Sequence, residues 1–271
     1  MERTPLYIKD NKIIIDENSG SSNRFVIDLK DHHSSLDLSI NERMKADFLF
    51  FNIEDGLDLH FDIKDNSEVQ FAILAEKAAK QMKISANVGY SSLIRGYFAD
   101  FIESDSKCEV LVNLNGEGSS VDWHLSSLAH GNYKKEFDVS AVHRNINTYS
   151  QLDNYGVCRD DAKLIFSGIC QIDKGSHASK AHQNAKIMIF DELSNGIAKP
   201  ILKIDENDIE ASHASVVGKI NDEHLFYLTS RGLSEERAKQ LITFGYLKPI
   251  IKGFDDEKII AHIEDKIEGK I

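Results

Sequence analysis

The chain has 271 residues, of which 41% are hydrophobic and 28% charged, and its formal net charge is −12. This composition predicts an ordered globular protein with one large domain or two modest ones. The acidic balance and the lack of a dense basic stripe argue against binding to nucleic acid or to anionic membranes, and no run approaches the roughly 18 apolar residues that span a bilayer.

The cysteines and the amino-terminal residues indicate the cellular compartment. Cys108, Cys158 and Cys170 are odd in number and show no Cys-x-x-Cys spacing, so a disulfide framework is not expected. Residues 1–10 lack the apolar stretch of a secretory signal. We therefore expect a cytoplasmic protein.

Short runs of alternating or β-branched residues, separated by Asn, Asp, Gly and Ser, occupy the chain up to about residue 220. Such runs with turn residues between them predict β-strands. Examples are residues 12–16, 24–29, 48–53, 57–63, 108–114, 162–172 and 186–190. Residues 68–82 are rich in Ala, Lys and Glu and suit a helix by propensity, but we assign them to strand because their neighbours are strands.

The strands recur with too little helix between them for a doubly wound sheet, which leaves a sandwich, a barrel or a β-solenoid. Two repeats favour the solenoid. Ser-His-Ala-Ser occurs at residues 176–179 and again at residues 212–215, and hydrophobic runs begin at Lys163 and at Lys186, 23 positions apart. The sequence therefore predicts an all-β solenoid over residues 1–220.

After the strands the sequence becomes helical in character. Asp222 is expected to cap a short helix, and Ser234 to open a second one that ends at Gly245. Residues 255–267 carry isoleucines at helical spacing. We expect residues 221–271 to form a separate carboxy-terminal helical segment.

Common catalytic motifs are absent from the sequence. The Gly-Lys pairs that end at Lys219 and Lys270 lack the glycine of a phosphate-binding loop, since His213 and Glu264 stand five positions before each glycine. There is also no Gly-x-Ser-x-Gly and no His-Glu-x-x-His. We therefore predict that the chain is not an enzyme and does not itself hydrolyse nucleotides.

A β-helix lyase or glycosidase is the alternative function that the residues leave open. Such an enzyme uses paired carboxylates, and the candidates are Asp153, Asp160, Asp161 and Asp173. Exposed aspartates in turns explain the same residues without catalysis. The lack of a secretory signal also argues against this alternative.

Eight phrases in the second part of the chain carry a family resemblance when they are taken in order. They are residues 114–119 (Leu-Asn-Gly-Glu-Gly-Ser), 143–150 (His-Arg-Asn-Ile-Asn-Thr-Tyr-Ser), 155–157, 166–168, 181–184, 199–202, 211–218 and 225–236. In these phrases the chain resembles the SufB/SufD family of iron–sulfur cluster assembly proteins. The first hundred residues match that family only as a pattern of strands.

The resemblance implies a right-handed parallel β-helix followed by a short helical segment. Family members pair through their β-helices, and their helical tails dock SufC, an ABC-type ATPase that would hydrolyse the ATP. The expected contacts with this partner are Leu225, Phe226, Tyr227, Arg231, Glu235, Leu241 and Phe244. The alternative role for Phe226, Leu228, Leu241 and Phe244 is to cap the open end of the β-helix.

This sequence departs from the family at three positions. A cysteine of SufB lies in the strand that matches Asn184, and a glutamate of SufB stands where this chain has Ala214. An optional cysteine of SufD corresponds to Ala211. The chain therefore looks SufD-like, with a SufB-like subunit or a second copy of itself as its pairing partner, and with a transient iron–sulfur cluster rather than a permanently bound cofactor.

His213 is the residue expected at the cluster site, either as an iron ligand or as a hydrogen-bonding residue of the subunit interface. Cys158 and Cys170 are further candidate ligands, because thiolates suit iron, although free cysteines are also typical of protein cores. His177 is expected to be a solvated residue of a turn, and His182 to stabilise a turn.

Overall fold

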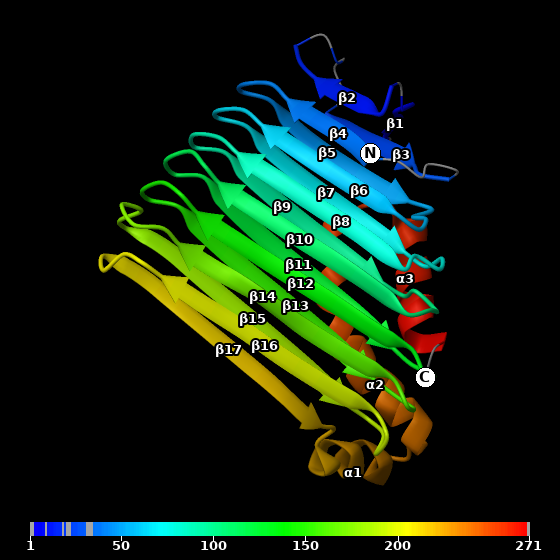
Figure 1. The fold of residues 1–271 in the computed structure, drawn as a ribbon. Helices are drawn as coiled ribbons and strands as arrows, with labels where there is room; N and C mark the ends of the chain where they lie inside the picture. The colour runs from blue at the N-terminus through cyan, green and yellow to red at the C-terminus, as the bar shows by residue number, and fades with distance from the viewer. Residues whose placement is uncertain (1–2, 9, 18, 20–22, 31–34, 270–271) are drawn as a thin grey trace.

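The computed structural model describes residues 3–8, 10–17, 19, 23–30 and 35–269, and it is a β-solenoid of parallel strands (Figure 1). Its strands form two sheets, and the chain alternates between them, so that odd-numbered strands lie in sheet A and even-numbered strands in sheet B. Neighbouring strands within each sheet are parallel. The predicted solenoid class is thus confirmed.

The strands of both sheets lengthen along the chain. Sheet A contains β1 (Thr4–Pro5), β3 (Arg24–Asp28), β5 (Lys45–Phe51), β7 (Glu68–Ala75), β9 (Leu93–Asp100), β11 (Ser120–Ala129), β13 (Tyr149–Cys158), β15 (Ser179–Ile189) and β17 (Ile209–Lys219). Sheet B contains β2 (Lys12–Ile15), β4 (Ser35–Ile40), β6 (Leu57–Ile63), β8 (Gln81–Val88), β10 (Ser106–Leu114), β12 (Lys134–His143), β14 (Lys163–Ile172) and β16 (Asn195–Ile204). Residues 68–82 are strand except for a break at residues 76–80, in agreement with the prediction.

Buried and more exposed side chains alternate along most strands, and the buried ones form the core of the solenoid. Successive side chains of a strand point to opposite faces, and the inward faces of the two sheets meet in one hydrophobic interior. Aromatic rings pack there from coil to coil, as in the pairs Phe61–Phe71 and Phe98–Phe137. This interior holds the two sheets together.

The lengths of the coils explain why one predicted repeat was wrong. Phe25 pairs with Phe48, 23 positions later, but Tyr149 pairs with Lys180, 31 positions later. The run that begins at Lys163 belongs to β14 in sheet B, whereas Lys186 lies in β15 of sheet A. The two lysine-led runs are therefore not equivalent positions of successive coils.

The two Ser-His-Ala-Ser copies are not equivalent either. The first copy forms the turn that leads into β15, and the second lies inside β17. Ser179 pairs with Ile209, so the local coil repeat is 30 residues and not the 36 residues that separate the two copies. The predicted fold class is right, but the two copies do not occupy equivalent positions of successive coils, as the prediction assumed.

Four helical elements follow the strands: α1 (Asp222–Ser230), α2 (Glu235–Leu247), the 3₁₀ helix η1 (Lys248–Gly253) and α3 (Glu257–Gly269). Ser234 caps α2 as predicted, since its hydroxyl accepts a hydrogen bond from the Arg237 amide at 3.2 Å. The cap of α1 is Asn221 rather than Asp222, because Asn221 Oδ1 accepts from the Glu223 amide at 2.8 Å. Helix α2 also continues past Gly245.

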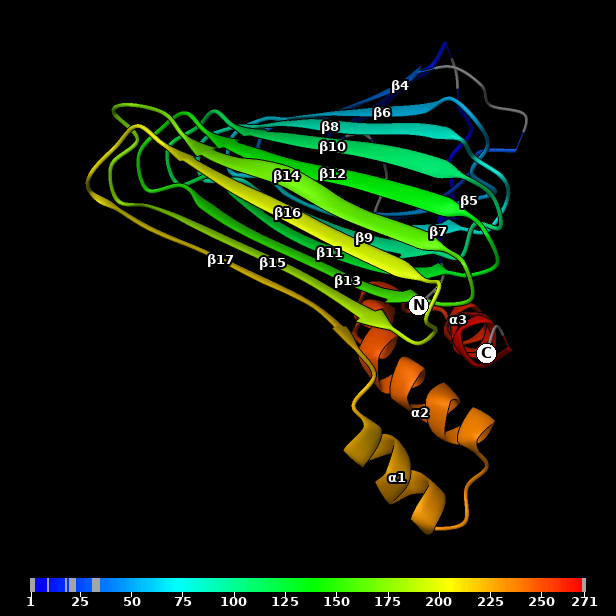
Figure 2. The ribbon, with the colours of Figure 1, turned by 60° about the horizontal axis from the view of Figure 1, so that its bottom comes forward.

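The helical elements after α1 lie along the outer face of sheet A (Figure 2). We call residues 235–269 the strap. The strap and the sheet share a second hydrophobic core, in which Leu247, Ile250 and Ile263 of the strap pack with Leu128 and Val157 of the sheet. The strand region ends at Lys219 and α1 begins at Asp222, next to the expected boundary, and the division into two separate domains stays a prediction.

Candidate functional site at the open end of the solenoid

The last coil of the described chain leaves one end of the solenoid open. Within the described residues, β17 pairs only with β15, and β16 pairs only with β14. The inward positions of β17 follow from its register, because their partners in β15 are buried: Ile209, Ala211, His213, Ser215 and Val217. An edge strand of this kind presents unpaired backbone groups to a further strand.

The predicted residue His213 lies in the middle of this edge strand. Its register partner is the buried residue Gln183, so the His213 side chain belongs to the inward row of β17. His213 is nevertheless exposed, because in the described structure no coil follows to cover it.

The open end is rich in exposed apolar residues. Ile201 of β16 and Val216 and Val217 of β17 are all exposed. Within β17 the charged residues are Glu210 near the beginning and Lys219 at the end. In β16, Lys199 and Lys203 lie on either side of Ile201. Exposed apolar surface rimmed by polar residues is typical of a protein–protein contact.

Asn184 and Ala214, two of the positions where the chain departs from SufB, are direct register partners in β15 and β17. Both belong to the outward rows of their strands, opposite to the row of His213. Asn184 Nδ2 donates a hydrogen bond to Asp153 Oδ1 at 2.7 Å. The structure thus brings two of the three departure positions together and separates them from His213.

A polar ladder that sequence reasoning missed continues from Asp153 across the outer face of sheet A. His124 lies between Asp122, at 2.9 Å, and Asp153, at 3.8 Å, and its ring stacks on Tyr97. Burial alone would raise the pKa of Asp122, but contacts with His124 and Arg95 outweigh it and lower that pKa. The alternation of Asp122 and His124 in one strand, two positions apart, could have predicted that they share a face.

His177 and His182 lie in different kinds of local structure, a turn and a strand. His177 lies in a turn, as predicted, with Nδ1 3.4 Å from Glu206. Backbone amides of Gly175 and Asn207 lower the pKa of Glu206 to about 2. His182 does not stabilise a turn as predicted, because it lies within β15 and its ring hydrogen-bonds Ser212 of the neighbouring strand β17 at 2.8 Å.

The candidate cysteine ligands lie in the interior. Burial raises the pKa of Cys158 to about 11 and that of Cys170 to about 12, so both are neutral thiols at pH 7. Cys158 Sγ donates to the Ala162 carbonyl at 3.0 Å. No group of three or more His, Cys, Asp or Glu side chains suited to a metal ion occurs in the part of the chain that the structure describes.

The family phrase at residues 143–150 forms a buried corner. The two ring nitrogens of His143 hydrogen-bond Thr148 at 2.7 Å and Ser150 at 2.8 Å. Thr148 Oγ1 in turn lies 2.7 Å from Ser179 Oγ, at the end of the first Ser-His-Ala-Ser copy. Burial lowers the pKa of His143 to about 4, so this residue supports the turn as a neutral imidazole.

The expected docking residues are distributed over α1 and α2. Phe226 is 73% exposed, and Tyr227 and Leu241 are also exposed. Arg231 lies over the Tyr227 ring at 4.9 Å. Phe244 packs against the core beneath the strap. Leu225 is partly buried, and Glu235 is paired with Lys239 at 2.8 Å.

The carboxylates of the enzyme alternative have local structural partners. Asp160 Oδ2 accepts from the Gly131 amide at 2.7 Å, and Asp173 Oδ1 accepts from Gln171 Nε2 at 2.6 Å. Asp161 lies in the turn beside Asp160, and Asp153 belongs to the polar ladder. Each carboxylate thus has a place in a turn or on a sheet face.

These features define a class of protein: a two-sheeted parallel β-solenoid with an open, apolar end and a helical strap on one sheet. The chain belongs to the SufB/SufD family, because the family model described as "SUF system FeS cluster assembly, SufBD core domain" matches residues 13–246. The described helices are too short or too polar to be membrane spans.

Two similar proteins carry names that agree with this family. The chain is 31% identical over 169 residues to the iron–sulfur cluster assembly protein SufD of Bacillus subtilis (strain 168), which covers 62% of this chain and 39% of that protein. It is 29% identical over 201 residues to the SufBD family protein ML0593 of Mycobacterium leprae (strain TN), which covers 72% of this chain and 21% of the relative. The chain thus spans about two fifths or less of the length of these relatives.

Proposed function

We propose that this chain is a non-catalytic scaffold subunit in iron–sulfur cluster assembly. In this proposal it pairs through the open end of its solenoid and docks an ABC-type, SufC-like ATPase through α1 and α2. The observation that carries the docking proposal is helix α1, which projects beyond the strands with Phe226 exposed (Figure 2).

The arrangement of the helices suits this role. Helix α1 packs against α2, and α2 lies against β13, so a pull on α1 would reach the last coils of sheet A through α2. An apolar helix face is a common ligand for a groove on a partner protein. The sequence lacks a phosphate-binding loop, so ATP hydrolysis is assigned to the partner.

A nascent cluster would be held only transiently in this proposal. Asn184 and Ala214 provide neither the thiolate nor the carboxylate of SufB, so a SufB-like pairing subunit would supply most of the ligands, whereas a second copy as the partner would bring only the same residues as this chain. His213 would support the site from the open edge, and Cys158 and Cys170 remain the weaker candidates. The three described cysteines are free thiols, which suits a reducing cytoplasm.

Co-purification with a SufC-like ATPase tests the docking proposal. Phe226→Asp is expected to lower recovery of the ATPase at least tenfold, because a charge replaces the exposed apolar anchor. Tyr7→Ser is the matched control, since Tyr7 is 89% exposed at the other end of the solenoid, and it should leave recovery unchanged. Equal recovery with Phe226→Asp and with wild type would contradict docking through α1.

A further inference from the structure

Four isoleucine side chains lie on the outer face of sheet B, on its last two strands. Ile165 and Ile169 of β14 are the register partners of Ile197 and Ile201 of β16, so they form two cross-strand pairs. Ile169 is 38% exposed and Ile201 is 50% exposed, and the other two isoleucines are half-buried. The pairs lie four residues apart along the strands, which is roughly 13 Å at the rise of a β-strand. This surface thus offers two separate apolar contacts.

Three lysines surround the isoleucine pairs and have no acidic partner. Lys163 lies in β14, Lys199 and Lys203 lie in β16, and none of the three forms an ion pair in the part of the chain that the structure describes. The two strands contain neither Asp nor Glu. Several lysines elsewhere on the sheet faces do have such a partner, as Lys45 has in Glu68 at 2.9 Å. We call the four isoleucines and three lysines the lysine–isoleucine face, and it is a positive surface on a chain with a net charge of −12.

The backbone is irregular at the centre of the lysine–isoleucine face. The ladder between β12 and β14 is interrupted around Gly168, where the Ile169 amide donates to Ser140 Oγ at 2.9 Å. A Cβ atom added at Gly168 would collide with the Val139 carbonyl oxygen. Interruptions of this kind re-aim side chains, and Ile169 is the most exposed residue of β14.

The opposite face of the solenoid shows how these sheets accept a helix. On sheet A, Leu247 and Ile263 of the strap pack with Leu128 and Val157. The strap lies on that side only, and no described helix covers the outer face of sheet B (Figure 2). Two turns of an α-helix span about 11–12 Å, close to the separation of the isoleucine pairs. A helix along β14 and β16 can therefore place one apolar side chain on each pair.

We infer that the lysine–isoleucine face binds an acidic amphipathic helix of a partner protein. Apolar side chains two turns apart cover the two isoleucine pairs, and carboxylates beside them meet the three lysines. Such charge complementarity sets the choice of partner and the rate of association. The outward rows of both strands contain no arginine and no aromatic residue, the side chains on which nucleic-acid bases stack.

This partner is a different one from the pairing subunit of the proposed function. The pairing subunit meets the free edge of β17, whereas the lysine–isoleucine face points away from the plane of sheet B. The two contacts therefore use different surfaces of the last coils, and each can be tested without the other.

Binding of a synthetic helix tests the inference. The probe is a fluorescent peptide of about 18 residues, long enough to form a helix, with leucines two turns apart on one side and glutamates beside them. The full chain should bind it in fluorescence anisotropy, and the affinity should fall as salt screens the carboxylates from the lysines. Lys199→Glu should weaken binding about tenfold through like-charge repulsion, and Ile169→Ser about fivefold through lost apolar contact.

Lys45→Glu is the matched control for the charge reversal. Lys45 is 73% exposed on the outer face of sheet A, and its replacement changes the net charge by the same amount. It should leave the affinity for the peptide unchanged. Thermal unfolding of the three variants should match that of wild type, because all three side chains are exposed.

Two further probes separate the acidic helix from other ligands. A peptide in which lysines replace the glutamates should not bind. Vesicles that contain phosphatidylglycerol should not sediment the chain. Sedimentation with the vesicles but no binding of the acidic peptide would overturn the protein partner in favour of a membrane surface. Wild type that binds neither probe at about 1 mM peptide, or Lys199→Glu that binds the peptide like wild type, would overturn the inference.

Recovery of the SufC-like ATPase distinguishes this inference from the proposed function. Lys199→Glu should recover the ATPase like wild type, because α1 lies outside the lysine–isoleucine face. Loss of ATPase recovery in this variant would show that the face is not independent of the docking helices and would overturn the inference. Failure of the wild type to recover the ATPase would contradict the proposed docking and leave the peptide measurement intact.

Discussion

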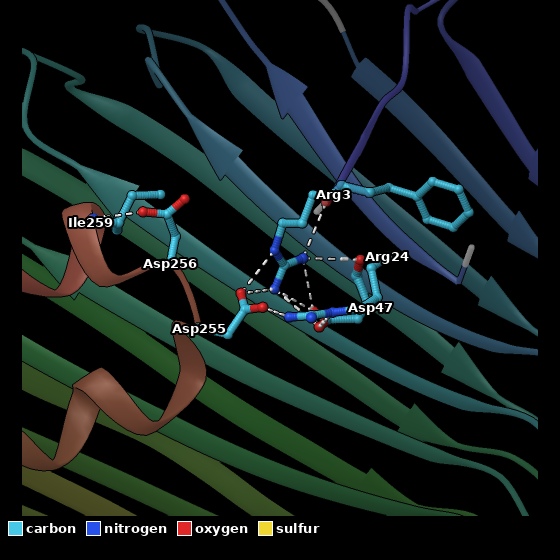
Figure 3. A network of polar contacts seen from close by, with 7 residues as sticks. Arg3, Arg24, Asp47, Asp255, Asp256 and Ile259 are labelled. Carbon is cyan, nitrogen blue, oxygen red and sulfur yellow. Dashed lines mark hydrogen bonds and ion pairs between the residues drawn. The ribbon is translucent and has the colours of Figure 1, made fainter. Parts of the chain in front are cut away.

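Arg3 and Asp255, 252 positions apart in the chain, are joined directly: Arg3 Nε and a second guanidinium nitrogen donate to Asp255 Oδ1 at 2.9 Å and 2.7 Å (Figure 3). The same guanidinium group donates to Asp47 of β5. Arg24 of β3 also contacts Asp47 and Asp255. These four side chains anchor the far end of the strap to the first coils of sheet A.

Replacement of Asp255 by alanine should loosen the strap. The Arg3 side chain is only 7% exposed and would lose one of its two carboxylate partners, so we expect the free energy of unfolding to fall by about 1–3 kcal/mol. In the variant, amide hydrogen exchange in α3 should be faster than in wild type, and this increase should be larger in α3 than in the strands. Lys45→Ala, which breaks the exposed pair with Glu68, is the control and should change neither measurement. Equal exchange in α3 of both variants would contradict the anchor.

A fully buried ion pair should contribute more to stability than the partly exposed Arg3–Asp255 pair. Lys135 Nζ lies 2.8 Å from Asp100 Oδ2, both side chains are fully buried, and Ser127 Oγ donates to the same Asp100 oxygen at 2.6 Å. Lys135→Met leaves a buried carboxylate without its cation, so the free energy of unfolding in urea should fall by about 3–5 kcal/mol. Adding Asp100→Asn should restore part of this loss. If the double variant is as unstable as the sum of the single variants, the two residues are not coupled.

The sequence was sufficient to predict a fold built of many short strands, but not which strands pair. Alternating β-branched runs between turn residues define each strand locally. Strand pairing, in contrast, depends on coil lengths that vary between Phe25–Phe48 and Tyr149–Lys180. This variation explains why the runs at Lys163 and Lys186 were wrongly matched.

The candidate site was predictable in position but not in orientation. The family phrases predicted that His213 lies near a pairing surface, and the structure shows that it lies in the edge strand β17, but only the register of β17 with β15 assigns His213 to the inward row and Ala214 to the outward row. Contacts between distant segments, such as Arg3 with Asp255, leave no local pattern in the sequence.

The cysteines provide a test of how accessible the interior is. Burial raises the pKa of all three thiols, that of Cys158 to about 11 and that of Cys170 to about 12. Because the thiolate is the reactive form, the native chain should not react with an aromatic disulfide reagent at pH 8, and all three thiols should react after unfolding. Rapid reaction of one thiol in the native chain would show that this thiol reaches solvent. Such a result would support the hypothesis that it is an iron ligand.

The buried imidazole of His143 makes the stability depend on pH. Burial lowers its pKa to about 4 in the folded chain, against about 6.5 when unfolded. Between these values the unfolded chain binds the additional proton, so stability is complete above pH 6.5 and falls as the pH drops to 4, by on the order of 3 kcal/mol. Urea unfolding of wild type and His143→Gln from pH 7.5 to 4 tests this prediction. The variant should be less stable at pH 7.5, because the hydrogen bonds to Thr148 and Ser150 are altered, and the difference should shrink toward pH 4. A difference that stays constant over this range would mean that the protonation of His143 does not contribute, because the carboxylates that titrate near pH 4 are the same in both proteins.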